Sequence, residues 1–485
     1  MIYKLRPYQE ECVKSISDYI NSDRHDPVLI VGPVGCGKSL LIAEAARLMG
    51  DKTLILQPSK ELLQQNHNKI TSYGIPATIY SASCGKKELS NMIYATLGSI
   101  KKVVGQLKEM GIRNVLIDEA HAGYSPEDGS EFMTFMNELK PKKVIGFTAT
   151  PCRLKTMSIG QVSYSQLNFI TRMRPVYFKN LIHVIQVEEM IRQGFWTPLK
   201  YETWDFNGDA LKLNSNGSEY TAESISEAVR KNGLNNLILR RLMVLKDVCR
   251  SILVFMDSVE SCNTAAEWMN AKICAGMAEV VHGGTPKKQR EAIVEGFKSG
   301  KTKVVFNYSA LGTGFDHPGL DCVIVGRPTF SFSSFYQWLG RAVRIKDGKD
   351  SALVVDCCNN SSRFGDIRKL SIENYKGYGW GMFIGDKLIT NIPMGDKVTK
   401  TDLDIKAAKK DRRRGLAQGV TAAPVPGRPD HPLGSTVMTF GKYCGWMFHS
   451  IPVSYFKFIN ETFDWSNDRN REIKAVSYTH LRAHE

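Results

Sequence analysis

The sequence contains no uncharged apolar run that approaches the roughly 18 residues needed to span a bilayer. Its first residues, Met1 to Arg6, also lack the apolar core of a signal peptide. The eleven cysteines are scattered and include no C-x-x-C pair, which argues against a disulfide framework and against a cysteine-based zinc site. We therefore expect a soluble, cytoplasmic protein.

Composition disfavours several classes of protein. Hydrophobic residues make up 42% of the 485 residues and charged residues 23%, near the averages of globular domains, so wholesale disorder, collagen and coiled coil are disfavoured. The length corresponds to roughly three domains. A net charge of +15 favours a polyanionic partner, either nucleic acid or an acidic membrane.

Short apolar runs alternate with helix-like segments in two stretches of the chain. The expected strands of the first stretch are 27–31, 53–56, 115–117 and 144–147, and those of the second are 252–255, 279–281, 304–306, 323–325 and 352–355. Helix-like segments include 40–49 and 286–298. This alternation predicts an α/β fold in which each stretch forms a parallel sheet with helices on both faces.

Changes in composition divide the chain further. The polar, basic segment 155–175 is expected to be an ordered insertion or a mobile loop, and 207–217 is expected to turn. The stretch 416–436 is rich in proline and glycine, as linkers are. The expected divisions are a first α/β domain (1–155), an insertion and connection (156–230), a second α/β domain (231–370), a basic extension (371–415), the linker (416–436), a small aromatic C-terminal module (437–475) and a non-native tail (476–485).

A glycine-rich segment between an expected strand and an expected helix carries the strongest chemical signal. Its glycines Gly32, Gly35 and Gly37 precede Lys38 and Ser39 in the pattern G-x-x-x-x-G-K-[ST]. Glycines let backbone N–H groups surround a phosphate, and the helix N-terminus adds partial positive charge. The pattern predicts that Lys38 reaches the β- and γ-phosphates of a nucleotide and that Ser39 ligates Mg²⁺.

A pair of carboxylates follows the expected strand 115–117. Asp118 and Glu119 stand at its C-terminal end, the edge at which open α/β sheets bind ligands. We expect Asp118 to hold Mg²⁺, directly or through water, and Glu119 to polarise the attacking water. The alternative is an acidic surface turn.

A further motif, which contains two arginines, lies in the second α/β stretch. Gln337, Arg341 and Arg344 fit Q-x-x-G-R-x-x-R, and on one helix these three side chains would share a face. Arginines on a second domain can supply positive charge to the far side of a γ-phosphate when the domains close. The alternative is a solvated basic helix face.

Together these segments resemble, in order, the motifs of superfamily 2 helicases and translocases of the DEAD/DEAH-box type, over about residues 1–360. Segments 5–9, 57–62, 95–99, 148–150, 253–257, 282–285 and 312–316 resemble the family's remaining motifs. The resemblance implies nucleotide contacts through Arg6, Gln9, Gly312 and Asp316, coupling between domains through His121, Thr148 and Thr150, and nucleic-acid contacts through Pro58, Ser59, Lys60, Thr96, His282, Gly283 and Thr313.

The resemblance also implies two tandem RecA-like domains, with ATP and Mg²⁺ in their cleft and a nucleic-acid path across both. It favours DNA over RNA, a phage-type helicase that couples hydrolysis to strand translocation or unwinding, and a short C-terminal domain of unknown function. Relatives often stack adenine on an upstream aromatic residue, for which Tyr3 is the candidate. Two alternatives stay open: an ATP-driven DNA translocase or fork remodeller that does not separate strands, and a non-hydrolysing nucleic-acid-binding scaffold.

Overall fold

The computed structural model describes residues 4–50, 52–159, 162–311, 315 and 317–407. For residues 157–159 and 162–163 it describes the backbone only. The chain divides into two compact units, Met1–Lys400 and Thr401–Glu485, and the described fold is that of the first. Several predicted features lie outside the described residues: Tyr3, Gly312, Thr313, Asp316, the linker, the C-terminal module and the tail.

The first α/β region is built on an eight-stranded sheet in the order β10-β1-β7-β6-β2-β5-β3-β4. Neighbouring strands pair in parallel except for β3 and β4. The strands are β1 (Val28–Val31), β2 (Thr53–Leu56), β3 (Thr78–Ser81), β4 (Lys86–Lys87), β5 (Met92–Ala95), β6 (Asn114–Ile117), β7 (Lys143–Thr148) and β10 (Asn180–Val184). The helices of this region are α1 (Pro7–Asn21), α2 (Lys38–Met49), α3 (Lys60–Ser72), α4 (Leu97–Ile100), α5 (Val104–Glu109) and α6 (Glu131–Leu139).

The second α/β region has a six-stranded, all-parallel sheet in the order β11-β16-β15-β12-β14-β13. Its strands are β11 (Leu199–Thr203), β12 (Ile252–Phe255), β13 (Ala278–His282), β14 (Val304–Tyr308), β15 (Cys322–Val325) and β16 (Ala352–Asp356). Its helices are α8 (Ala222–Lys231), α9 (Leu234–Val248), α10 (Val259–Lys272), α11 (Lys287–Ser299), α12 (Phe332–Leu339) and α13 (Asn360–Phe364).

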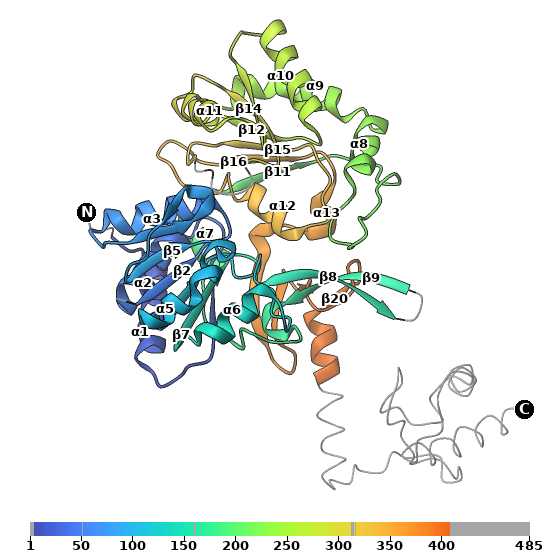
Figure 1. The fold of residues 1–485 in the computed structure, drawn as a ribbon. Coiled ribbons are helices and arrows are strands. Elements are labelled where there is room, and N and C mark those ends of the chain that lie inside the picture. Colours follow the sequence, from blue (N-terminus) through green and yellow to red (C-terminus); the bar gives the residue numbers. More distant parts are fainter. Residues whose placement is uncertain (1–3, 51, 160–161, 312–314, 316, 408–485) are drawn as a thin grey trace, which may run out of the picture. The chain divides into compact units, whose positions relative to one another are not determined.

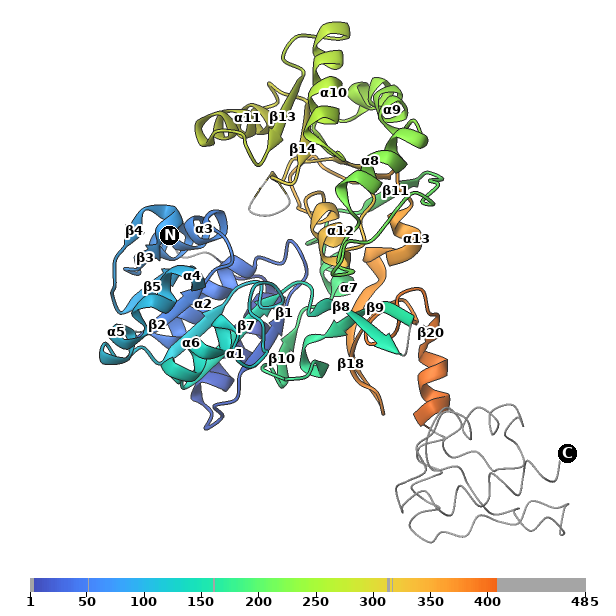
Figure 2. The same ribbon diagram turned by 45° about the vertical axis from the view of Figure 1, so that its right-hand side comes forward.

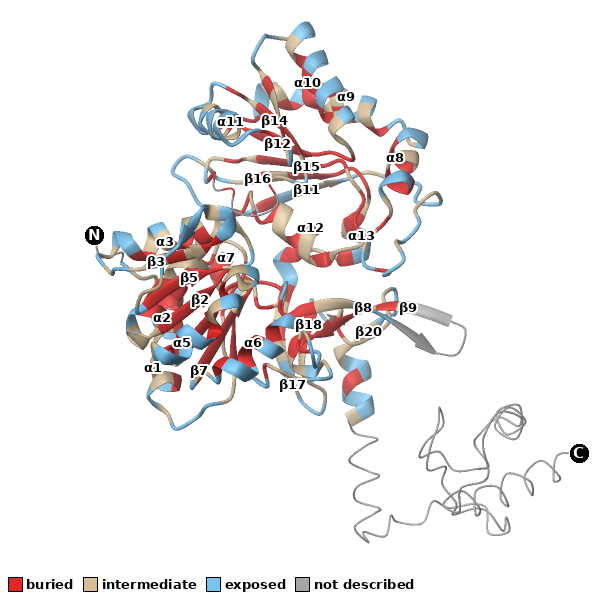
Figure 3. Ribbon diagram, in the orientation of Figure 1, coloured by how far each residue is buried: buried red, intermediate tan, exposed pale blue. Residues whose placement is uncertain are grey.

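Central strands of both sheets are buried along their whole length, as expected for strands that are covered on both faces (Figure 1, Figure 3). The predicted α/β class, with one parallel sheet in each half, is confirmed. Every strand predicted from an apolar run is present, and its ends differ from the expected ones by at most two residues.

The segment between the two sheets contains structure that the apolar pattern did not reveal. Strands β8 (Cys152–Ile159) and β9 (Val162–Phe169) form an antiparallel hairpin, β10 joins the first sheet, and β11 joins the second. Helix α7 (Val187–Arg192) connects β10 to β11. Polar residues are frequent in the hairpin because two-stranded ribbons leave much of their surface in water.

A small four-stranded sheet follows the second α/β region, with strands β17 (Leu370–Tyr375), β18 (Gly379–Ile384), β19 (Lys387–Leu388) and β20 (Val398–Thr399). It lies beside the β8–β9 hairpin in both views (Figure 1, Figure 2). The backbone N–H of Asn391 donates to Leu167 O at 2.7 Å, and that of Met394 donates to Ser165 O at 2.8 Å. Short 3-10 helices are η1 (Ala82–Cys84), η2 (Lys101–Val103), η3 (Ile170–Arg172) and η4 (Ile367–Lys369).

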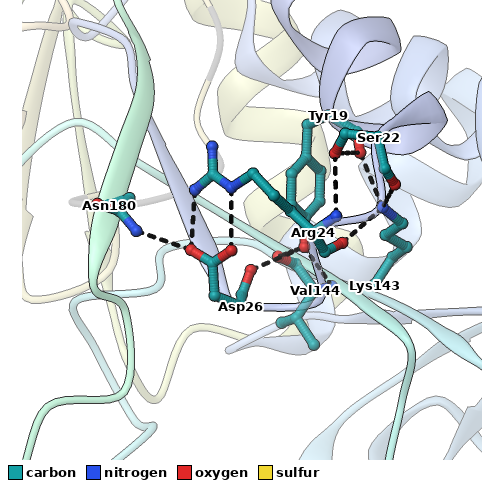
Figure 4. A network of polar contacts seen from close by, with 7 residues as sticks. All are labelled: Tyr19, Ser22, Arg24, Asp26, Lys143, Val144 and Asn180. Atoms are coloured by element: carbon teal, nitrogen blue, oxygen red, sulfur yellow. Dashed lines mark hydrogen bonds and ion pairs between the residues drawn. The ribbon is translucent and has the colours of Figure 1, made fainter.

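A buried ammonium group fixes the end of α1 next to the start of β1 (Figure 4). Lys143 Nζ donates to the carbonyl oxygens of Tyr19, Ser22 and Arg24 at 2.9, 2.7 and 2.6 Å. Carbonyl groups at a helix C-terminus lack intrahelical partners and attract positive charge. Lys143 therefore holds the chain that leads into β1, the strand that carries the phosphate loop.

No helix among the described residues is long and apolar enough to cross a membrane.

Candidate nucleotide-binding cleft

The glycine-rich loop between β1 and α2 has the backbone geometry of an anion site. Gly35 and Gly37 have φ angles of +82° and +85°, and α2 starts at Lys38 directly after Gly37. These positive φ angles favour glycine, and a Cβ atom on Gly37 would also displace the end of the Gln9 side chain, because it would lie 2.6 Å from Gln9 Nε2. The first N–H groups of α2 therefore face the loop opening, where a phosphate can accept them.

Lys38 and Glu119 form an ion pair beside this loop. Lys38 Nζ lies 2.5 Å from Glu119 Oε1. Burial by itself would raise the pKa of Glu119, but the nearby Lys38 ammonium and His121 outweigh it and hold the pKa well below its usual range. Glu119 is therefore ionised, as a residue that accepts a proton from water must be.

Asp118 is buried beside Glu119 and accepts hydrogen bonds from Asn66 Nδ2 and the Glu119 N–H, each at 2.9 Å. Burial and the negative charge of Glu119 raise the pKa of Asp118. A divalent cation next to Asp118 would offset both effects. Because Ser39 lines the same cavity, the donors fit Mg²⁺, whose remaining ligands would be water and phosphate oxygens.

The second α/β region supplies the opposite wall of the cleft. Gln337, Gly340, Arg341 and Arg344 line one cavity of about 500 Å³ together with Lys38 and other residues of the loop. The cavity therefore brings together the loop, both carboxylates and both arginines that the sequence singled out.

The expectation that Arg341 and Arg344 share one helix face is wrong. Helix α12 ends at Leu339, Arg341 lies in the following turn, and Arg344 lies in a segment without regular secondary structure. After Gly340 the backbone bonds tighten from four residues to three, since the N–H of Arg341 donates to Trp338 O at 3.2 Å and that of Ala342 donates to Leu339 O at 3.0 Å. A Cβ on Gly340 would lie 2.5 Å from Val34 Cγ2 in the phosphate loop, so glycine is needed at this close approach.

The two arginines nevertheless both reach the cavity. Arg341 Nη1 donates to the carbonyl oxygen of Phe315 at 2.6 Å. Burial lowers the pKa of Arg341 and of Arg344 to about 10, so both stay charged at neutral pH.

The three residues expected to couple the domains are joined by hydrogen bonds. His121 Nδ1 lies 2.8 Å from Thr148 Oγ1, and His121 Nε2 lies 3.2 Å from Ser333 Oγ on α12. Ser333 Oγ also lies 3.1 Å from Thr150 Oγ1. Sequence reasoning missed Ser333, although it lies one helical turn before Gln337 and could have been found by that spacing.

The expected adenine-reading residues lie at another part of the cavity wall. Gln9 Oε1 accepts from the Arg6 N–H at 3.0 Å, and Gln9 Nε2 donates to Cys36 O at 2.8 Å. This amide thus joins the start of α1 to the phosphate loop. Phe195 lines the same cavity and was missed by the sequence analysis, because no motif marks it.

Two family models match the chain, one in each α/β region. The model described as "Type III restriction enzyme, res subunit" matches residues 2–153, and the model described as "Helicase conserved C-terminal domain" matches residues 235–346. The chain belongs to helicase superfamily 2.

The chain is also similar to curated proteins of a phage and of an archaeon. A 51.5 kDa protein of a Lactococcus phage is 25% identical over 332 residues, 68% of this chain and 65% of its own. An ATP-dependent DNA helicase of Pyrococcus horikoshii is 25% identical over 376 residues, 69% of this chain and 49% of its own.

Among solved structures, the ATP-dependent Type ISP restriction-modification enzyme LlaBIII bound to DNA superposes with a TM-score of 0.55 at 16% identity, over 74% of this chain and 28% of that one. This likeness shows the fold. This chain covers less than two thirds of the length of the phage protein, of the archaeal helicase and of the restriction-modification enzyme.

The expected nucleic-acid contacts of this superfamily 2 chain lie at the carboxyl ends of parallel strands. Residues 58–60 follow β2 and Thr96 follows β5, and these strands are paired in register from Thr53↔Met92 to Leu56↔Ala95. His282 ends β13 in the second sheet and Gly283 follows it. Among the described residues that line the nucleotide cavity, none belongs to this set.

Proposed function

We propose that the protein is an ATP-dependent helicase that acts on DNA and couples ATP hydrolysis to strand translocation or unwinding. The observation that carries the proposal is the shared cavity of about 500 Å³, which Lys38 and Glu119 line from one sheet and Arg341 and Arg344 from the other region. A hydrolytic centre divided between two domains can respond to their relative movement.

Binding of the triphosphate starts from the phosphate loop. Its N–H groups and Lys38 Nζ meet the phosphate oxygens, and Lys38 then exchanges Glu119 for phosphate. The exchange frees the Glu119 carboxylate to accept a proton from the attacking water. Ser39 and Asp118 would hold Mg²⁺, which would supply positive charge to offset the negative charge that develops on the phosphate oxygens.

Arg341 completes the site from the second region. In the described structure its guanidinium donates to the carbonyl oxygen of Phe315. We expect it to turn to the γ-phosphate when the domains close, because a developing anionic charge is a stronger acceptor than a neutral carbonyl. Before nucleotide binds, the hydrogen bond to Phe315 holds the Arg341 side chain at the cavity wall.

DNA is the proposed substrate. The net charge of +15 supports a polyanionic partner. The residues expected to contact nucleic acid lie at strand ends and outside the cavity lining, which supports a path separate from the nucleotide cavity. The names of the archaeal relative and of the restriction enzyme structure refer to DNA, which favours DNA over RNA for this chain. We expect these contacts to be with the sugar-phosphate backbone of DNA, and contacts of that kind carry no sequence information.

Steady-state ATPase measurements with and without nucleic acid test this function. We expect Mg²⁺-dependent hydrolysis that rises severalfold with DNA. The stimulation should weaken as salt increases, because the release of counterions from DNA then contributes less free energy to binding. Equal turnover without nucleic acid and with single-stranded DNA, duplex DNA or RNA would refute the proposal.

The second candidate is an ATP-driven translocase that remodels DNA without separating strands, since the same cleft serves both activities. A strand-displacement assay beside a triplex-displacement assay distinguishes them. Triplex displacement without strand displacement would establish the translocase.

A further inference from the structure

One part of the cavity wall has a chemical character different from the phosphate loop. The guanidinium carbon of Arg6 lies 4.6 Å from the centroid of the Phe195 ring. The ring of Tyr8 meets that of Phe195 edge-on, with centroids 5.3 Å apart. Phe195 is the one aromatic side chain among the described residues that line the cavity.

The backbone of Phe195 is fixed by the end of helix α7. Gly194, with φ of +72°, follows the C-cap Gln193, and the N–H of Phe195 donates to Met190 O at 2.7 Å. The Gly194 N–H donates to Ile191 O at 3.1 Å, which completes a Schellman motif. The position of Phe195 therefore follows from local chain geometry.

The two residues after Phe195 are fastened to both walls of the cleft. Trp196 is only 2% exposed, and its Nε1 donates to Val34 O of the phosphate loop at 2.9 Å. Thr197 donates from its N–H to Val343 O at 2.8 Å and from its Oγ1 to Arg344 O at 2.7 Å. Phe195 thus stands on a rigid support, as a ligand platform needs.

We propose that Phe195 is the stacking platform for the purine base of the nucleotide, with Arg6 on the other face of the base and Gln9 at its edge. This inference rests on the proposed binding of ATP. Aromatic rings and guanidinium planes both stack on nucleobases, and a side-chain amide can both donate to and accept from a base edge. Phe195 comes from the connection between the two sheets and not from a segment upstream of α1.

Binding requires a movement of Arg6. Its guanidinium now occupies the face of Phe195 that the base would cover, and Arg6 Nη1 donates to Tyr8 Oη at 3.1 Å. The base takes that place and the guanidinium moves to the outer face of the base, which replaces one cation–π contact by two stacking contacts. Because every base has a π face, this platform alone does not select among bases.

Binding measurements with a nucleotide and with a phosphate chain that lacks a base test the platform. The variants are Phe195→Ala, Phe195→Leu and Phe195→Trp, and the ligands are ADP and inorganic tripolyphosphate, both with Mg²⁺. Phe195→Ala and Phe195→Leu should weaken ADP on the order of ten-fold, GDP by the same factor, and tripolyphosphate by less than about two-fold. Phe195→Trp should retain ADP.

Trp196→Phe is the matched control. It keeps an aromatic ring but removes the N–H that supports the phosphate loop, so it should weaken ADP and tripolyphosphate by the same factor. The inference is wrong if Phe195→Leu binds ADP as the wild type does, or if its affinities for ADP and tripolyphosphate fall equally. Phe195 would then only support the segment that connects the two sheets. If the wild-type protein binds neither ligand, the proposed function itself fails.

Discussion

The hydroxyl group of Ser333, on a helix of the second α/β region, lies 3.1 Å from Thr150 Oγ1 and 3.2 Å from His121 Nε2 of the first region. His121 Nδ1 in turn lies 3.3 Å from Glu119 Oε2. One hydroxyl of the second region is therefore two contacts away from the carboxylate proposed to activate water. A movement of helix α12 changes the surroundings of Glu119 through this chain.

Ser333→Ala is expected to uncouple hydrolysis from nucleic acid. Removal of the hydroxyl breaks both bonds to the first region, but it leaves the phosphate loop intact. We expect nucleotide Kd to change by less than about two-fold, and DNA-stimulated kcat to fall on the order of ten-fold while basal kcat changes much less. Kinetics with and without saturating DNA measure both quantities.

Ser334→Ala is the control for that variant, because the Ser334 hydroxyl donates to Ser331 within its own helix at 3.0 Å. A Ser333→Ala protein with unchanged stimulation by DNA would show that the bridge carries no coupling.

Arg341→Ala is expected to separate binding from chemistry. An arginine that meets the γ-phosphate from a second domain contributes on the order of 10³–10⁵ in rate. We expect kcat to fall by about that factor, and nucleotide Kd to change much less because Lys38 and the phosphate loop remain. Exposed Arg240 on α9, changed to alanine, controls for the loss of charge. Retention of more than about a tenth of wild-type kcat would transfer the role to Arg344.

Changes at Lys38 and Glu119 are expected to differ in their effect on ATP binding: the first weakens it and the second leaves it in place. Lys38→Ala should weaken ATP affinity and hydrolysis together, and should also destabilise the protein, since it leaves the Glu119 carboxylate buried without its ammonium partner. Glu119→Gln removes the proton acceptor, so the protein should bind ATP and stall. Equilibrium binding and single-turnover hydrolysis measure the difference. Near-wild-type hydrolysis by Glu119→Gln would contradict the assignment of Glu119 as the base.

The free energy of unfolding is expected to decrease as pH falls, because His317 binds a proton more readily in the unfolded chain than in the folded one. Burial, followed by the charges of Lys346, Lys298 and Lys349, lowers the pKa of His317 to about 4. The unfolded chain takes up this proton near pH 6.5 and the folded chain does not, so stability is lost as pH falls below about 6.5.

Denaturant unfolding at pH 7 and pH 5 measures this loss. Between these values His317 accounts for about 2 kcal/mol of the decrease in unfolding free energy. His317→Gln should show a correspondingly smaller decrease. An equal decrease in both proteins would show that other groups cause the acid sensitivity.

The sequence alone determined the α/β class, most strand positions and the residues of the phosphate loop and carboxylate pair. These features depend on local patterns: apolar runs of strand length, glycines where φ must be positive, and carboxylates placed directly after a strand. Lys38 and Glu119 could be named because each belongs to such a short pattern, even though 81 positions separate them along the chain.

Tertiary structure alone decided how these pieces meet. Gly340 packs against Val34 of the phosphate loop, Phe195 meets Arg6, and Ser333 meets Thr150, and each of these partners is far away in the sequence. Close packing between distant segments leaves no periodic trace in the amino-acid sequence, since it depends on the distances between atoms that only the folded chain brings together.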